Sequence, residues 1–189
     1  MADFTMIILA GGMSRRMGCN KADLLLGTHS FLETQVQKGI ALGAREILVS
    51  GYQGPQTGFR TVADRLPNHG PLAGLEACLR TAACETCLVL SVDTPLVPES
   101  ELQQLLNFSR SAGSPITITK CGNREQPLVG IYHRSLADSM LQALTEGKGS
   151  VFAFLNTVGY AVYESSAPAH LFSNVNTPKE YAALVPSEQ

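Results

Sequence analysis

The sequence predicts an α/β fold, a single domain on a mostly parallel sheet with helices on both faces. Short apolar runs alternate with segments of helical periodicity over most of the 189 residues. Glycines and capping residues separate these segments, and no internal repeat, low-complexity segment or linker interrupts the order. This Rossmann-like arrangement binds ligands beyond the carboxyl ends of its strands, where the strand order reverses.

The first strand and helix follow from the residues up to 43. Apolar residues 6–9 predict a short buried strand, which a run of small residues ends. Ser30-x-x-Glu33 is a capping box, so we expect a helix to begin there and to end at Gly43. The predicted apolar face of this helix consists of Phe31, Leu32, Val36 and Ile40.

The middle of the chain continues the alternation. The predicted elements are strands at 46–50, 59–63 and 86–91, a helix at 72–82 and a helix that Pro98 and Glu99 open. Asp64 directly follows the second of these strands, and Asp93 lies just past the end of the third. We expect both carboxylates and the loop after residue 9 to line one crevice.

The last third adds the remaining strands and helices. We predict strands at 116–120, 128–133 and 160–164, a helix at 135–146 and one helical turn at 151–155. A Gly122-Asn123 turn and the pair Gln126-Pro127 lie between the first two of these strands. Thr177-Pro178-Lys179-Glu180 is a second capping box and predicts a final helix.

Composition excludes several classes of function. The net charge of −2 and the absence of Trp argue against a nucleic-acid partner, and no apolar run is long enough to cross a bilayer. The amino-terminal residues lack the features of a signal peptide, so we expect a cytoplasmic protein with reduced cysteines. Cys84-x-x-Cys87 has no second pair at zinc-site spacing, so we interpret both residues as small core side chains.

Residues 6–21 favour phosphate binding. The strand ends at Ala10-Gly11-Gly12, where bare backbone N–H groups let an anion approach, and Arg15, Arg16 and Lys21 follow. The spacing fits neither the P-loop nor the dinucleotide fingerprint. A solvated basic turn is the alternative.

Asp93 at a strand end suits Mg²⁺, which takes one or two carboxylates plus substrate phosphates. Together with the basic loop it indicates phosphoryl or nucleotidyl transfer, in which positioning and charge stabilisation dominate. No Ser-His-Asp or Cys-His arrangement stands out, and a phosphate nucleophile needs no general base. The alternative for Asp93 and Asp64 is an ordinary turn or helix-capping role.

The first loop, LAGGMSRRMGCNK, resembles the signature loop of nucleoside-triphosphate transferases, LAGG-x-S-x-RMG-x-x-K. Four further stretches extend the resemblance over nearly the whole chain, to the molybdenum cofactor guanylyltransferases, which attach GMP to molybdopterin. The four stretches are 64–75 (DRLPNHGPLAGL), 90–98 (LSVDTPLVP), 126–132 (QPLVGIY) and 172–181 (FSNVNTPKEY). The first loop supports only the broad class, because cytidylyl- and sugar-nucleotidyltransferases share it. The stretches GPLAGL and NVNTP favour the guanylyl branch.

The resemblance implies roles for individual residues in one nucleotidyltransferase domain over 1–189. Backbone groups beside guanine and ribose would be those of Leu9, Ala10 and Gly11. The triphosphate would be held by Gly12, Arg15 and Lys21, of which Arg15 and Lys21 neutralise charge as pyrophosphate leaves. Asp64 would help to hold the nucleoside. The family often has asparagine near the base after the second strand, where this chain has Ser50-Gly51-Tyr52, so Ser50 or Tyr52 would have to replace it.

The resemblance also implies the metal and the partners. Asp93 would bind the Mg²⁺ cofactor and would be catalytic together with Arg15 and Lys21, while Asn174 and Asn176 would lie near the metal or the pterin. The implied substrates are GTP and molybdopterin, with or without molybdenum. Molybdenum-insertion proteins or molybdoenzyme chaperones are candidate protein partners.

Three alternatives remain open from the sequence. The nucleotide could be CTP or another nucleoside triphosphate. The acceptor could be a different phosphorylated molecule, such as a sugar or alcohol phosphate. The chain could also bind a nucleotide without turnover, although Lys21 and Asp93 are both present and argue for an enzyme.

Overall fold

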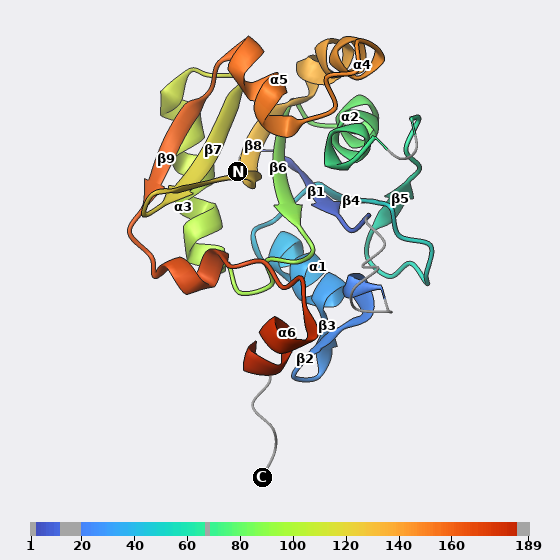
Figure 1. Ribbon diagram of the computed structural model, residues 1–189, viewed down its shortest axis with the longest axis vertical. Coiled ribbons are helices and arrows are strands. Elements are labelled where there is room, and N and C mark those ends of the chain that lie inside the picture. The colour runs from blue at the N-terminus through green and yellow to red at the C-terminus, as the bar shows by residue number, and fades with distance from the viewer. Residues whose placement is uncertain (1–2, 12–19, 67–68, 185–189) are drawn as a thin grey trace.

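A seven-stranded sheet forms the centre of the molecule (Figure 1). The computed structural model describes residues 3–11, 20–66 and 69–184. In spatial order the strands are β5 (Arg60–Val62), β4 (Glu46–Ser50), β1 (Thr5–Leu9), β6 (Thr86–Ser91), β8 (Arg124–His133), β7 (Ile116–Cys121) and β9 (Ala161–Ser165). Within this sheet β8 alone runs antiparallel to its neighbours. The predicted α/β class with a mostly parallel sheet is confirmed.

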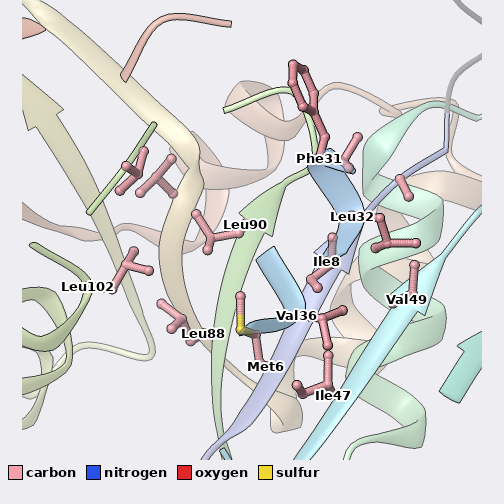
Figure 2. Packing of buried hydrophobic residues seen from close by; sticks show 14 of the residues in the cluster. Met6, Ile8, Phe31, Leu32, Val36, Ile47, Val49, Leu88, Leu90 and Leu102 are labelled. Carbon is pink, nitrogen blue, oxygen red and sulfur yellow. The ribbon is translucent and has the colours of Figure 1, made fainter. Parts of the chain in front are cut away.

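Helices cover both faces of the sheet, as predicted. One face carries α1 (Phe31–Ala41) and α3 (Glu99–Ala112), and the other carries α2 (Pro71–Thr81), α4 (Ala137–Thr145) and α5 (Val151–Val158). The alternation of side chains along each strand sends Met6 and Ile8 into the first core and Ile7 and Leu9 into the second. Figure 2 shows the first core, where side chains of β1, β4 and β6 meet those of α1 and α3.

Short elements complete the fold. They are the hairpin β2 (Leu25–Leu26) with β3 (His29–Ser30), the 3₁₀ turns η1 (Lys21–Asp23), η2 (Arg134–Leu136) and η3 (Ala169–Phe172), and the helix α6 (Pro178–Leu184). The Tyr181 hydroxyl of α6 donates to the Leu25 carbonyl at 2.9 Å, which holds α6 beside the hairpin (Figure 1). Within the described ranges, no helix combines the length and apolar character that a membrane span requires.

The apolar face of α1 differs from the prediction. Both hydrogen bonds of the Ser30–Glu33 capping box are present, but Ile40 is 55% exposed. A Cβ at Gly39 would lie 2.6 Å from the Met6 sulfur, so at that turn the helix lies against the sheet through its glycine. This close approach turns Ile40 outward and brings Gln35 and Lys38 into the interior.

Two other segments extend beyond their predicted limits. The helix at 151–158 replaces a single turn, because the Ser150 hydroxyl caps it and Gly159 follows it. Strand β8 includes Pro127, which was expected between strands. A register shift after Ile118 loosens the pairing of β7 with β8 there, so the missing proline N–H is tolerated.

The four described cysteines are free thiols in the core. Cys84 and Cys87 are both buried, and burial raises the pKa of the Cys87 thiol to about 12. A thiol in this state is a poor metal ligand and nucleophile at neutral pH. The interpretation of Cys84-x-x-Cys87 as core residues is confirmed.

Candidate active site at the carboxyl edge of the sheet

The carboxyl ends of β1, β4 and β6 lie at one edge of the sheet. Leu9 pairs with Ser50 on one side and with Ser91 on the other. The Ala10 N–H donates to the Ser50 carbonyl at 2.9 Å, and the Val92 N–H donates to the Leu9 carbonyl at 3.0 Å. The three segments that follow these strands therefore begin side by side at a topological switch point.

Lys21 and Asp93 meet at this edge. The Lys21 Nζ lies 3.1 Å from Asp93 Oδ2, with side chains that are 14% and 13% exposed. Asn20 caps the turn η1 by accepting the Ala22 N–H, and so fixes the start of the segment that carries Lys21. Ser91 Oγ donates to Asp93 Oδ1 at 2.6 Å. The predicted proximity of Lys21 and Asp93 is confirmed, and each carboxylate oxygen has a defined donor.

The segment before α6 closes the site from the far end of the sequence. The Val175 N–H donates to the Asp93 carbonyl at 2.9 Å, and Asn176 Oδ1 accepts from Lys21 Nζ at 2.5 Å. The predicted capping box of Thr177 and Glu180 is present and holds this segment. Asn174 and Asn176 thus flank Val175, the residue that contacts Asp93, and their expected place near the metal or the pterin stays a prediction.

Asp64 lies at the same edge on the side of β4 and β5. Ser50 Oγ donates to Asp64 Oδ1 at 2.7 Å. A Cβ at Gly74 would come within 2.2 Å of Ser50 Oγ, so α2 can approach this pair only through a glycine. The stretch GPLAG therefore packs directly against the hydroxyl–carboxylate pair.

Neither side chain that could replace the family's asparagine offers an amide. Ser50 is 2% exposed and its hydroxyl is bonded to Asp64. The Tyr52 hydroxyl donates to Asp23 Oδ1 at 3.1 Å, and its ring meets Phe59 edge-on. Gly51 between them has a φ of +76°, and a Cβ there would lie 2.3 Å from the Gly11 Cα. The loops after β1 and β4 are thus in backbone contact.

The oxygen atoms at the edge suit a hard cation. In the described ranges no three His, Cys, Asp or Glu side chains gather as a metal-binding group. Mg²⁺ needs no such group, because it takes one or two carboxylates and leaves its other positions to water and substrate phosphates. Asp93 supplies a carboxylate, and the buried Asn174 Oδ1 has no hydrogen-bond partner among the described residues. These residues fit Mg²⁺.

A cavity of about 530 Å³ opens beside Asp93. Its lining includes Thr94, Asn174 and Ser91, whose hydroxyl donates to Asp93. The remaining polar lining comes from β7, β8 and their turn and includes one carboxylate, Glu125, besides Lys120, Asn123, Arg124 and Gln126; Lys120 is also paired with Glu164 at 3.0 Å. Cationic and amide groups there suit an anionic ligand with a polar ring system.

Two buried side chains of α1 support the Asp93 loop from below. Gln35 Nε2 donates to the carbonyls of Ser91 and Thr94 at 3.0 and 3.1 Å. Lys38 Nζ donates to the Pro95 carbonyl at 2.6 Å and to Gln35 Oε1 at 3.0 Å. Burial lowers the pKa of Lys38 to about 8, although the negative charge of Glu99 opposes the shift.

This shift predicts how Lys38→Met changes the pH dependence of stability. The folded protein releases the Lys38 proton near pH 8, whereas the unfolded chain holds it until about pH 10.5. The penalty for burying the charge is therefore present below pH 8 and fades as pH rises to 10.5. Between pH 7 and 10 we expect the free energy of unfolding of the wild type to rise by about 2–3 kcal/mol relative to the variant. Urea unfolding at both pH values measures this.

Lys148→Met is the control, because Lys148 is 55% exposed. The difference between that variant and the wild type should stay flat over the same interval. A flat difference for Lys38→Met as well would contradict the shifted pKa.

Part of the predicted site lies outside the described residues, namely Gly12 and Arg15. Of the others, Leu9, Ala10, Gly11, Asp64 and Asp93 lie at the edge, together with Lys21, Asn174 and Asn176. Sequence reasoning missed Gln35 and Lys38, whose only signal was two polar residues on the buried face of an amphipathic helix. It also missed the cations of the cavity.

Comparisons with known proteins agree with this geometry. The MobA-like NTP transferase domain matches residues 6–159. A probable molybdenum cofactor guanylyltransferase of Carboxydothermus hydrogenoformans is 31% identical, and the match covers 98% of this chain and 96% of the relative. A molybdenum cofactor guanylyltransferase of Shewanella halifaxensis is also 31% identical, and the match covers 94% of this chain and 92% of the relative. Among solved structures, molybdopterin-guanine dinucleotide biosynthesis protein A of Archaeoglobus fulgidus has the same fold, with a TM-score of 0.81, 23% identity and coverage of 95% and 96%. The chain is a nucleotidyltransferase and belongs to the MobA-like NTP transferase family.

Proposed function

We propose that the protein transfers GMP from GTP to the terminal phosphate of molybdopterin and releases pyrophosphate, with Mg²⁺ as cofactor. The names of its relatives support this choice of nucleotide and acceptor. The observation that carries the proposal is the common edge of β1, β4 and β6, where Lys21 contacts Asp93 beside a polar cavity.

Nucleoside and acceptor take opposite sides of Asp93 in this proposal. The nucleoside lies over Leu9–Gly11 and beside Asp64, whose Oδ1 accepts from the Ser50 hydroxyl. The acceptor lies in the cavity with its phosphate near Ser91 and Asn174, and Lys120 and Arg124 attract its charge. Asp93 then stands between the two reacting phosphates, because Ser91 donates to its carboxylate and Val175, which follows Asn174, donates to its carbonyl.

Lys21 is held in place before any substrate arrives. Among the described residues two of its three ammonium hydrogens go to Asp93 and Asn176, which leaves one direction for a phosphate oxygen. A cation fixed in this way stabilises the charge that develops as pyrophosphate leaves. Arg15, from its position in the signature loop, adds a second cation in the proposal.

Asp93 and Asn174 Oδ1 would hold Mg²⁺. When bound, the ion neutralises charge on the phosphate oxygens and orients them. The acceptor phosphate is already anionic at neutral pH, so its oxygen attacks the α-phosphorus without a general base. A P–O–P bond forms as the bond from the α-phosphorus to the bridging oxygen breaks, and the electron pair leaves with pyrophosphate.

We also propose a cytoplasmic location, with molybdenum-insertion proteins or molybdoenzyme chaperones as the partners that deliver the acceptor or take the product. The proposal for location rests on the reduced cysteines of the core.

Pyrophosphate release tests the proposed reaction. The purified protein is mixed with Mg²⁺, molybdopterin and each of GTP, CTP, ATP and UTP in turn. We expect release with GTP at least tenfold faster than with the other three, and none without molybdopterin.

Other results of the same assay would support a different nucleotide, a different acceptor or a protein without turnover. Release with CTP and not GTP would place the protein in the cytidylyl branch, and release only with a sugar phosphate would replace the acceptor. Thermal stabilisation by GTP with no release under any condition would identify a binding protein without turnover.

A further inference from the structure

The loop that carries Asp93 is held from outside by α1. Within the loop, Ser91 Oγ donates to Asp93 Oδ1 and Thr94 Oγ1 donates to the Ser91 carbonyl at 3.0 Å. The carbonyls of Thr94 and Pro95 point towards α1. There the Thr94 carbonyl accepts a hydrogen bond from Gln35 Nε2, and the Pro95 carbonyl accepts one from Lys38 Nζ. Three carbonyl groups on both sides of Asp93 are therefore bound by two side chains of one helix.

The contact forms a closed network of hydrogen bonds. Both amide hydrogens of Gln35 are used by the Ser91 and Thr94 carbonyls, and its oxygen accepts from Lys38. Gln35 is 0% exposed and Lys38 is 7% exposed. The orientation of the Gln35 amide is thus fixed, because a flipped amide would turn its oxygen towards two carbonyl oxygens.

A purely structural helix face would not need these residues. The other inward residues of α1 include Phe31, Leu32 and Val36, which pack against β1, β4 and β6 (Figure 2). A buried ammonium group is unfavourable unless it gains matching partners, and apolar side chains of similar volume usually pack as well or better. The lowered pKa of Lys38 agrees with that penalty.

We infer that Gln35 and Lys38 are positioning residues, which fix the loop after β6 so that the Asp93 carboxylate faces Lys21 and the substrate phosphates. The inference rests on the proposed function. Neither side chain contacts Asp93, so both act through the backbone at Ser91, Thr94 and Pro95. Because a displacement of about 1 Å at a reacting group can lower a rate 10²-fold, a small shift of this loop is enough to reduce turnover.

Gln35→Glu tests this inference with little change in shape. The variant keeps an acceptor for Lys38, but places a carboxylate oxygen against the Ser91 and Thr94 carbonyls. We expect kcat for pyrophosphate release to fall 10- to 100-fold, KM for GTP to stay within threefold, and the Mg²⁺ concentration for half-maximal rate to rise at least fivefold. The amides of Val92, Thr94 and Val97, which are hydrogen-bonded in this loop, should also exchange hydrogen at least tenfold faster in the protein without ligands.

Gln37→Glu is the matched control, because Gln37 lies on the same helix and is exposed. It should leave all four quantities unchanged. Lys38→Gln is a second variant, to be used if Gln35→Glu does not fold. It should lower kcat, raise the Mg²⁺ requirement and speed hydrogen exchange in the loop, with KM for GTP within threefold of the wild type.

The outcomes separate this inference from the proposed function. An active wild type with unchanged kcat, Mg²⁺ requirement and exchange in folded Gln35→Glu or Lys38→Gln would overturn the inference alone. Faster exchange and reduced thermal stability without any change in kcat or Mg²⁺ requirement would also overturn it, because that pattern belongs to a structural role. No release by the wild type with any nucleoside triphosphate would overturn the proposed function, and the positioning role with it.

Discussion

Asp93→Asn is expected to lower the rate of pyrophosphate release about 10³-fold, or ~4 kcal/mol of transition-state stabilisation, while the protein stays folded. Asparagine keeps the shape and one acceptor oxygen for Lys21, and its Nδ2 can donate to the Ser91 hydroxyl, which now donates to Asp93. It loses the negative charge that would hold Mg²⁺ and orient Lys21. The rate is measured with GTP, molybdopterin and saturating Mg²⁺, and folding by urea unfolding.

Asp138→Asn is the control for this substitution. Asp138 lies on α4, its side chain is 89% exposed, and it pairs with Arg80. This variant should release pyrophosphate at the wild-type rate. A rate for Asp93→Asn within about threefold of the wild type would remove Asp93 from the catalytic group. Weaker Mg²⁺-dependent GTP binding by the variant, in a protein whose wild type releases no pyrophosphate, would favour the binding protein without turnover.

Gly51→Ala should both destabilise the fold and weaken GTP binding. A side chain at a φ of +76° costs about 1–2 kcal/mol. The Cβ would also lie 2.3 Å from the Gly11 Cα and 2.6 Å from the Gly11 nitrogen, so the backbone of one loop must move. Overpacking of this kind adds about 1–3 kcal/mol, and we expect a total near 3 kcal/mol. The moved backbone at Gly11 is the surface proposed to meet the base, so affinity for GTP should fall at least tenfold.

Gly43→Ala isolates the contact from the backbone strain. Gly43 has the same φ of +76°, but a Cβ there meets nothing within 4 Å. This variant should lose only about 1–2 kcal/mol and bind GTP normally. Urea unfolding and calorimetric titration with GTP measure both quantities. Equal effects of the two substitutions would contradict the argument from the contact between the loops.

Sequence reasoning predicted the fold well because its signals are local. Alternating apolar runs, capping boxes and glycine turns fixed the order of strands and helices, and strand polarity then placed Asp64, Asp93 and the glycine loop at one edge. The predicted meeting of Lys21 and Asp93 followed from that polarity and from the signature loop.

What the sequence could not predict depends on contacts between distant elements. The rotation of α1 is set by the approach of Gly39 to Met6 and Ile47, and periodicity alone placed Ile40 inside instead. The support of the Asp93 loop by Gln35 requires the distance between a helix and a loop 56 positions away. The cavity is lined by Pro127 and its neighbours, where the pairing of β7 with β8 shifts register, and the sequence shows there only a proline before an apolar run.

The contact between Lys21 and Asn176 joins positions that are 155 residues apart. A ribosome has therefore made every residue up to Asn176 before this part of the site can close, whereas β1 and β4 can pair much earlier. Val175 must likewise be translated before the Asp93 carbonyl finds its donor. The site is thus complete only after residues 174–176 have been made, and a chain that stops before NVNTP has a sheet without a finished site.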